Sequence, residues 1–203
     1  MTRPGRSLDE LWLETLNKLC AWAAHDLKGA LNGVSVNLEV VRTRSAKPVL
    51  EGLDISRFAA AATHQLGQVI GMTEAVLAWA RRAPDPFPLA PVLPRIIVLL
   101  RPGLETSGRN LELVEPLPDL GTTSVSGAAV RLAVASALLA TTESSARVVC
   151  AAETMDGIAT FRIDHGGAPV QSFGADLLTR LREAGVQFEN VERRITIAVP
   201  RQP

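Results

Sequence analysis

The sequence has little of several residue types that mark specialised proteins. It contains no tyrosine, only two cysteines among 203 residues, and an aromatic content of 4%. Cys20 and Cys150 lie far apart and each falls in an apolar pattern, which indicates small buried side chains rather than a disulfide or metal ligands. The formal net charge is zero, so no excess of basic residues points to nucleic acid or to a membrane surface.

Long hydrophobic runs are also missing. No apolar segment approaches the roughly 18 residues that cross a bilayer, and residues 1–10 lack the apolar core of a signal peptide. We therefore expect a cytoplasmic protein that associates with no membrane. Hydrophobic residues still make up 47% of the chain, which is enough for a packed core.

Two helical patterns open the chain. Apolar residues that alternate at spacings of three and four predict a helix over about 7–45, and Ser7 with Glu10 forms a capping-box pattern. A turn is expected at 46–54 and a second helix at about 55–82. The two helices form an antiparallel hairpin whose apolar stripes are too wide for one hairpin to cover, so we predict a homodimer with a four-helix bundle.

The prolines of residues 84–91 exclude a helix and predict a stiff linker. It separates an N-terminal hairpin unit, residues 1–83, from a C-terminal unit, residues 92–203. Helical and strand patterns mix in the second unit, as is typical of an α+β layer domain. Its expected helices cover 92–100, 127–141 and 173–184, and its expected strands cover 111–114, 147–152, 158–164 and 194–200, with Asp156-Gly157 as a hairpin turn.

His25 is the residue that most suggests chemistry. It falls at the heptad position furthest from the apolar seam of the first helix, so its imidazole is expected to be exposed. A lone histidine on a polar helical face is most often a solvated residue. Here Asp26 follows it and can orient the ring, and Lys28 lies on the same side and can neutralise phosphate charge, which favours phosphoryl transfer.

The run from His25 to Leu31, which begins His-Asp-Leu-Lys, resembles the phospho-acceptor motif of bacterial sensor histidine kinases. Ala30 stands where proline is usual in that motif. The order of elements along the chain also resembles the transmitter core of that family. The resemblance implies a dimerisation hairpin that carries the acceptor histidine, followed by a kinase/gyrase-type α/β sandwich domain.

The nucleotide-binding motifs of that family are degenerate in this sequence. Ala137 and Thr141 stand where its magnesium-binding helix carries asparagines, and an alanine cannot ligate magnesium. The adenine-binding motif at 164–168 lacks its last glycine, the long lid is absent, and Asp176 follows Gly174 where glycines usually hold phosphates. The resemblance therefore implies a degenerate ATPase domain that has lost ATP binding and needs no cofactor or metal of its own.

Together these features are similar to a histidine phosphotransferase that has diverged from a kinase. Such a protein moves a phosphoryl group between receiver-domain aspartates of a two-component phosphorelay, and magnesium would come from the receiver. His25 would be the catalytic nucleophile, Asp26 would orient its ring and Lys28 would screen the phosphate. Receiver domains of response regulators are the implied partners, and a hybrid histidine kinase is a further candidate partner.

The receiver is expected to dock on the hairpin surface around the histidine, where Gly29, Asn32 and Ser35 lie. Gly29 also occupies the position at which many of these kinases carry a threonine or asparagine that orients a water, so phosphatase activity of that type is not expected. Two alternatives stay open. One is an ATP-dependent histidine kinase core with divergent nucleotide motifs, and the other is a non-catalytic scaffold or inhibitor of a kinase or receiver.

Overall fold

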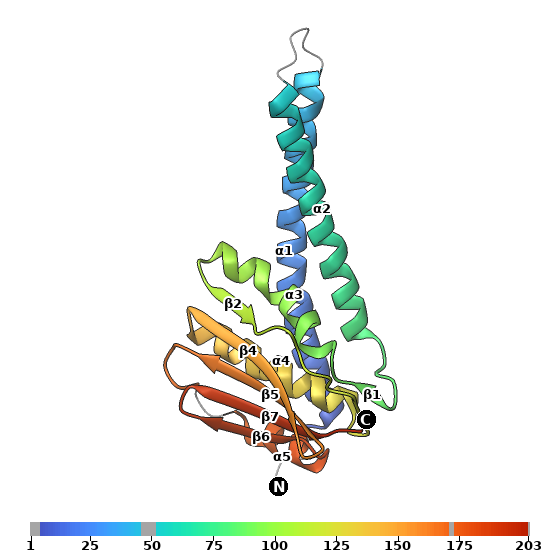
Figure 1. Ribbon diagram of the computed structural model, residues 1–203, viewed down its shortest axis with the longest axis vertical. Helices are drawn as coiled ribbons and strands as arrows, with labels where there is room; N and C mark the ends of the chain where they lie inside the picture. The colour runs from blue at the N-terminus through green and yellow to red at the C-terminus, as the bar shows by residue number, and fades with distance from the viewer. Residues whose placement is uncertain (1–4, 46–51, 171–172, 203) are drawn as a thin grey trace.

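The computed structural model describes residues 5–45, 52–170 and 173–202, and a long helical hairpin dominates its outline (Figure 1). The hairpin consists of α1, Leu8–Ser45, and α2, Gly52–Ala80. Both predicted helices are confirmed. The turn expected at 46–54 lies largely outside the described residues, and its last three positions belong to α2. None of the described helices combines the length and the hydropathy that crossing a bilayer requires.

The capping box at the start of α1 forms as predicted. The backbone N–H of Ser7 donates to Glu10 Oε2 at 2.7 Å, and the backbone N–H of Glu10 donates to Ser7 Oγ at 3.2 Å. The hydrogen bonds from Ser7 lower the pKa of the exposed Glu10 carboxyl. These bonds satisfy N–H groups that have no partner inside the helix, so α1 begins where the sequence indicates.

The C-terminal part is an α+β layer built on a five-stranded mixed sheet of order β2-β4-β5-β7-β6. Strands β2 and β4 are parallel and the other pairs are antiparallel. A separate two-stranded sheet pairs β1 with β3. The elements are β1 Phe87–Pro88, α3 Val92–Thr106, β2 Asn110–Leu113, β3 Thr122–Thr123, α4 Gly127–Ser144, β4 Arg147–Met155, β5 Ile158–His165, α5 Ala175–Glu183, β6 Gln187–Val191 and β7 Arg194–Pro200.

The hairpin turn between β4 and β5 follows the sequence prediction. Met155 pairs with Ile158, and the two residues between them, Asp156 and Gly157, have φ values of 51° and 75°. Two consecutive positive φ values match the twist of the flanking strands, and Asp-Gly adopts them readily. This turn fixes the register, so alternate residues of β5 from Ala159 onward point into the core.

Two predictions for this part are wrong in detail. The helix expected over 92–100 continues through Pro102 to Thr106, because buried Leu99, Leu100 and Leu104 hold the chain in place on both sides of the proline. Strand β6 was not predicted, because it is an edge strand with mostly exposed side chains and no apolar alternation. Backbone pairing with β7 makes it a strand.

Helix α4 lies between the hairpin and one face of the sheet, in contact with α1 on one side and with β4, β5 and β7 on the other. The residues on both sides of the predicted linker therefore share one hydrophobic core, which includes Leu19 and Trp79 of the hairpin. Burying side chains of this size contributes about 1.5–3 kcal/mol each. Arg131 of α4 reinforces the junction by donating to the carbonyl oxygens of Trp79 at 3.2 Å and Arg81 at 2.8 Å.

Candidate functional site

The imidazole of His25 projects from the middle of α1 into solvent, and its side chain is 89% exposed. Its Nδ1 lies 3.1 Å from Oδ1 of Asp26, whose side chain is only 10% exposed. The imidazole is thus exposed, as the sequence predicted. An imidazole whose Nδ1–H is bonded to a carboxylate presents the lone pair of Nε2 outward, where a second molecule can reach it.

The second carboxylate oxygen of Asp26 faces α3. Oδ2 is buried and has no hydrogen-bond partner among the described residues. A Cβ placed on Gly103 of α3 would lie 2.6 Å from this oxygen and 2.6 Å from Nε1 of Trp22. The carboxylate is therefore held between α1 and α3, with one oxygen toward His25 and the other under the backbone of Gly103.

The other residues that the sequence singles out near His25 lie on the exposed surface of α1. Lys28, Gly29, Asn32 and Ser35 are all exposed or partly exposed. A Cβ at Gly29 would meet no atom within 4 Å, so nothing within the described part of the chain covers this position. The Ser35 hydroxyl donates to the backbone oxygen of Leu31 at 3.0 Å. These four residues and His25 thus form one accessible strip on α1.

Asp164, which the resemblance assigns to adenine binding, points away from the helical layer. Its Oδ1 accepts from Arg194 Nε at 2.6 Å and its Oδ2 accepts from Arg162 Nε at 3.0 Å. It lines a hollow of about 450 Å³ on the outer face of the sheet, together with residues of β6 and β7. Both oxygens of this carboxylate therefore pair with guanidinium groups on the outer face of the sheet.

His165 occupies the core-facing position next to Asp164. It is 5% exposed, and neither ring nitrogen has a hydrogen-bond partner among the described residues. Burial lowers the pKa of this imidazole, and the neighbouring Arg193 lowers it further. The Gly167 backbone packs directly on the carbonyl of Ser144 at the end of α4, since a Cβ there would clash with that oxygen. The segment around Gly167 is thus packed against the end of α4.

The positions that the resemblance assigns to magnesium do not fit a metal ion. Ala137 is fully buried and Thr141 donates its hydroxyl to the backbone oxygen of Ala137 at 2.9 Å. Asp176, at the start of α5, faces Arg6 of the N-terminal segment, with its Oδ2 3.7 Å from Arg6 Nε. Across the described ranges, no three His, Cys, Asp or Glu side chains gather in a way that could hold a metal.

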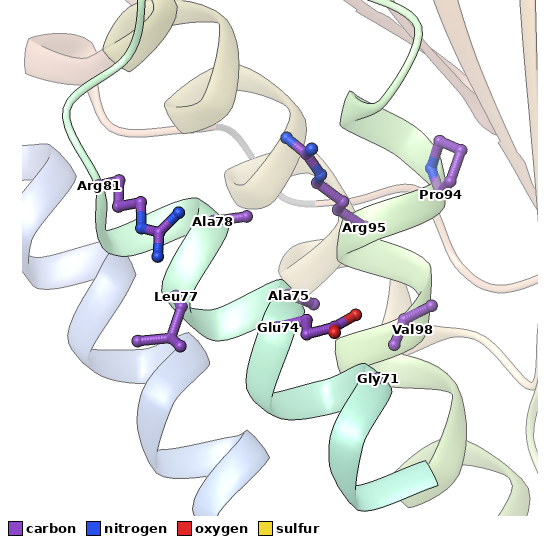
Figure 2. Close-up of a pocket in the computed structure, with 9 residues that line it drawn as sticks. All are labelled: Gly71, Glu74, Ala75, Leu77, Ala78, Arg81, Pro94, Arg95 and Val98. Carbon is purple, nitrogen blue, oxygen red and sulfur yellow. The ribbon is translucent and has the colours of Figure 1, made fainter. Parts of the chain in front are cut away.

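A further hollow of about 570 Å³ lies between α2 and α3 (Figure 2). Glu74 of α2, Arg81 just after α2 and Arg95 of α3 are among the residues that line it. No residue of α1 lines this hollow, so it is separate from His25. Neither this hollow nor the contact of Trp22 and Gly103 with Asp26 was predicted from the sequence. Gly103 lies beyond the helix expected over 92–100, so the sequence carried no signal for the latter contact.

No model of a protein family matches the chain, and no curated protein matches it. Solved structures that resemble it in fold include the following two. The Acinetobacter baumannii histidine kinase AdeS is 12% identical, with a TM-score of 0.40, over 88% of this chain and 98% of that one. Full-length ShkA in complex with AMPPNP is 17% identical, with a TM-score of 0.45, over 91% of this chain and 45% of that one. This chain therefore spans less than half of the ShkA chain, and at such identities neither protein assigns it an activity.

Proposed function

We propose that this chain is a histidine phosphotransfer protein of a two-component phosphorelay, with His25 as the phosphoacceptor and without use of ATP. The observation that carries the proposal is the pairing of an 89% exposed imidazole with a carboxylate that is 10% exposed. A surface histidine that serves only solubility needs no such partner. Here the carboxylate orients the ring while the reactive nitrogen stays accessible to another protein.

The transfer is an in-line attack by the neutral imidazole on the aspartyl-phosphate of a receiver domain. The lone pair of Nε2 forms the new P–N bond, and the P–O bond to the receiver aspartate breaks with its electron pair leaving on that carboxylate. The ring gains positive charge as the P–N bond forms. Asp26 offsets that charge at Nδ1, and Lys28 screens the phosphoryl oxygens.

Loss of nucleotide use is part of the same proposal. Asp164 is paired with Arg162 and Arg194 on the outer face of the sheet, and Thr141 donates its hydroxyl to a helix carbonyl. These contacts support a C-terminal unit that no longer binds ATP with magnesium. Magnesium for the transfer would then be held by the receiver, and this chain would contribute only the acceptor site and its surroundings.

A homodimer completes the proposal. Apolar side chains that are about half exposed recur at whole helical turns along both hairpin helices, which leaves an apolar stripe on each: Leu13, Leu31 and Leu38 on α1, and Leu66, Ile70 and Leu77 on α2. Exposed apolar stripes of this length favour association. A second copy of the hairpin would cover them in a four-helix bundle and leave His25, on the other side of α1, free for the receiver.

The test is phosphotransfer to the purified protein from a panel of receiver domains that carry radiolabelled aspartyl-phosphate, with His25→Ala as the matched control. We expect label on the wild type from at least one receiver and none on the variant. In parallel, both proteins are incubated with labelled ATP and magnesium. Label from ATP on the wild type alone would make the chain a kinase. Equal receiver binding by both proteins, with no label from any donor, would favour the scaffold.

A further inference from the structure

Helix α3 lies across the hairpin beside both α1 and α2 (Figure 1), and its contact with the acceptor residues is made by a glycine. Gly103 is the point of α3 at which a Cβ would meet Oδ2 of Asp26 and Nε1 of Trp22, each at 2.6 Å. Trp22 lies one turn before Asp26 on the same side of α1. Any larger residue at position 103 would therefore occupy the space that the Asp26 carboxylate now uses.

The contact matters because the Asp26 carboxylate has two oxygens and only one has a partner. Oδ1 lies 3.1 Å from His25 Nδ1, whereas Oδ2 is buried without a partner among the described residues. A carboxylate in water would turn freely and hydrate both oxygens. Here the backbone at Gly103 and the indole of Trp22 cover one side and keep Oδ1 directed at the imidazole.

We propose that Gly103 is a positioning residue for the phosphoacceptor: by packing on the Asp26 carboxylate, α3 holds His25 in the Nδ1–H tautomer that leaves Nε2 free to attack. The proposal rests on the function proposed for His25. Under this proposal the C-terminal unit positions the acceptor residues without binding a nucleotide. A water-excluded carboxylate also makes the stronger hydrogen bond, because its partner faces less competition from solvent.

The critical variant is Gly103→Ala. The atoms that the new Cβ would meet are the ends of two side chains rather than backbone, so the carboxylate can move aside and the fold is kept. The matched control is Gly67→Ala, a helical glycine of α2 at which a Cβ would meet nothing within 4 Å. Both variants replace glycine by alanine inside a helix, so they share the same change in helix propensity.

The first readout is the tautomer of His25, measured from its imidazole ¹⁵N shifts in long-range ¹H–¹⁵N spectra of the protein without any donor. We expect the Nδ1–H tautomer in the wild type and in Gly67→Ala, and a shift toward the Nε2–H tautomer in Gly103→Ala. The second readout is the phosphotransfer rate, which should fall about tenfold to a hundredfold in Gly103→Ala, since small misplacements of reacting groups cost that much.

Asp26→Asn provides the decisive background. If Gly103 acts through the carboxylate, adding Gly103→Ala to Asp26→Asn should change the rate less than about twofold, as expected when two substitutions remove one interaction. The proposal would be overturned if Gly103→Ala lowered the phosphotransfer rate equally in the wild-type and Asp26→Asn backgrounds. It would also be overturned if the His25 tautomer were unchanged in Gly103→Ala. The tautomer needs no phosphoryl donor, so failure of the positioning role is distinguishable from failure of phosphotransfer itself.

Discussion

The carboxylate of Asp26 is almost buried, yet it bonds to the imidazole of His25, which is almost fully exposed; Oδ1 and Nδ1 lie 3.1 Å apart. Adjacent residues of a helix point in directions about 100° apart. The pair therefore spans the edge between the solvated side of α1 and the side that packs on α3. His25 can therefore contact another protein, while Asp26 is held in place by the packing of α1 on α3.

This arrangement predicts opposite effects of Asp26→Asn on activity and on stability. Phosphotransfer to His25 should fall about a hundredfold, in the range expected when a group that assists proton placement is lost. The free energy of unfolding should rise by about 1 kcal/mol, because the substitution removes a charged oxygen that is buried without a partner among the described residues. Rates are measured with a labelled receiver, and stability by urea unfolding.

The control for this prediction is Glu39→Gln, which makes the same kind of change, from carboxylate to amide, elsewhere on α1. The Glu39 side chain is 58% exposed and accepts hydrogen bonds from Arg42 and Thr43 on the surface of the same helix. Loss of such a pair should change the free energy of unfolding by less than about 0.5 kcal/mol and leave the transfer rate unaltered. A similar fall in rate for both variants would remove Asp26 from its assigned role.

His165 predicts a pH dependence of stability. Burial holds the folded pKa of His165 below its ordinary value of 6.5, with Arg193 opposing and Asp164 favouring its protonation. The unfolded chain therefore binds this proton more tightly, and the free energy of unfolding decreases as the pH falls below about 6.5. His165→Leu should remove that part of the decrease. Unfolding curves of both proteins at about pH 7.5 and 5.5 test this. Equal pH dependence in the two proteins would exclude His165 as its source.

Cys150 predicts a thiol that is inert in the folded protein. The side chain is fully buried, and this burial raises the pKa of its thiol to about 12. At about pH 8 the thiol is therefore protonated, and its burial keeps reagents in solution from reaching it. In a Cys20→Ser background, an aromatic disulfide reagent should therefore find no reactive thiol until denaturant is added, and then one per chain. Rapid reaction of the native protein would place Cys150 outside the core.

The apolar stripes of the hairpin predict the site of dimerisation. Ile70→Asp puts a charge on a side chain that is 52% exposed, so the monomer should fold, whereas a bundle interface would have to bury that charge. We expect dimeric wild type and monomeric Ile70→Asp in light scattering coupled to gel filtration. Val36→Asp serves as control, because Val36 is 63% exposed but does not fall at the spacing shared by Leu31 and Leu38. A dimer that survives Ile70→Asp would exclude this face.

Much of the local structure was predictable from the sequence. The capping box of Ser7 and Glu10 marks the start of α1, and Asp156-Gly157 marks the hairpin turn, because each depends on bonds or dihedral angles within a few residues. The exposure of His25 followed from its position relative to the apolar seam. Strand β6 could not be predicted, since it depends on pairing with β7 rather than on a pattern of its own.

The sequence by itself determined where most of the helices lie and that the imidazole of His25 lies on the exposed side of α1. Only the tertiary structure decided that Asp164 pairs with arginines on the outer face, that Arg131 joins α4 to the end of α2, and that Gly103 covers the Asp26 carboxylate. The reason is physical. Helical periodicity and turn geometry depend on neighbours in sequence, whereas the burial of one carboxylate oxygen depends on a helix that lies far along the chain.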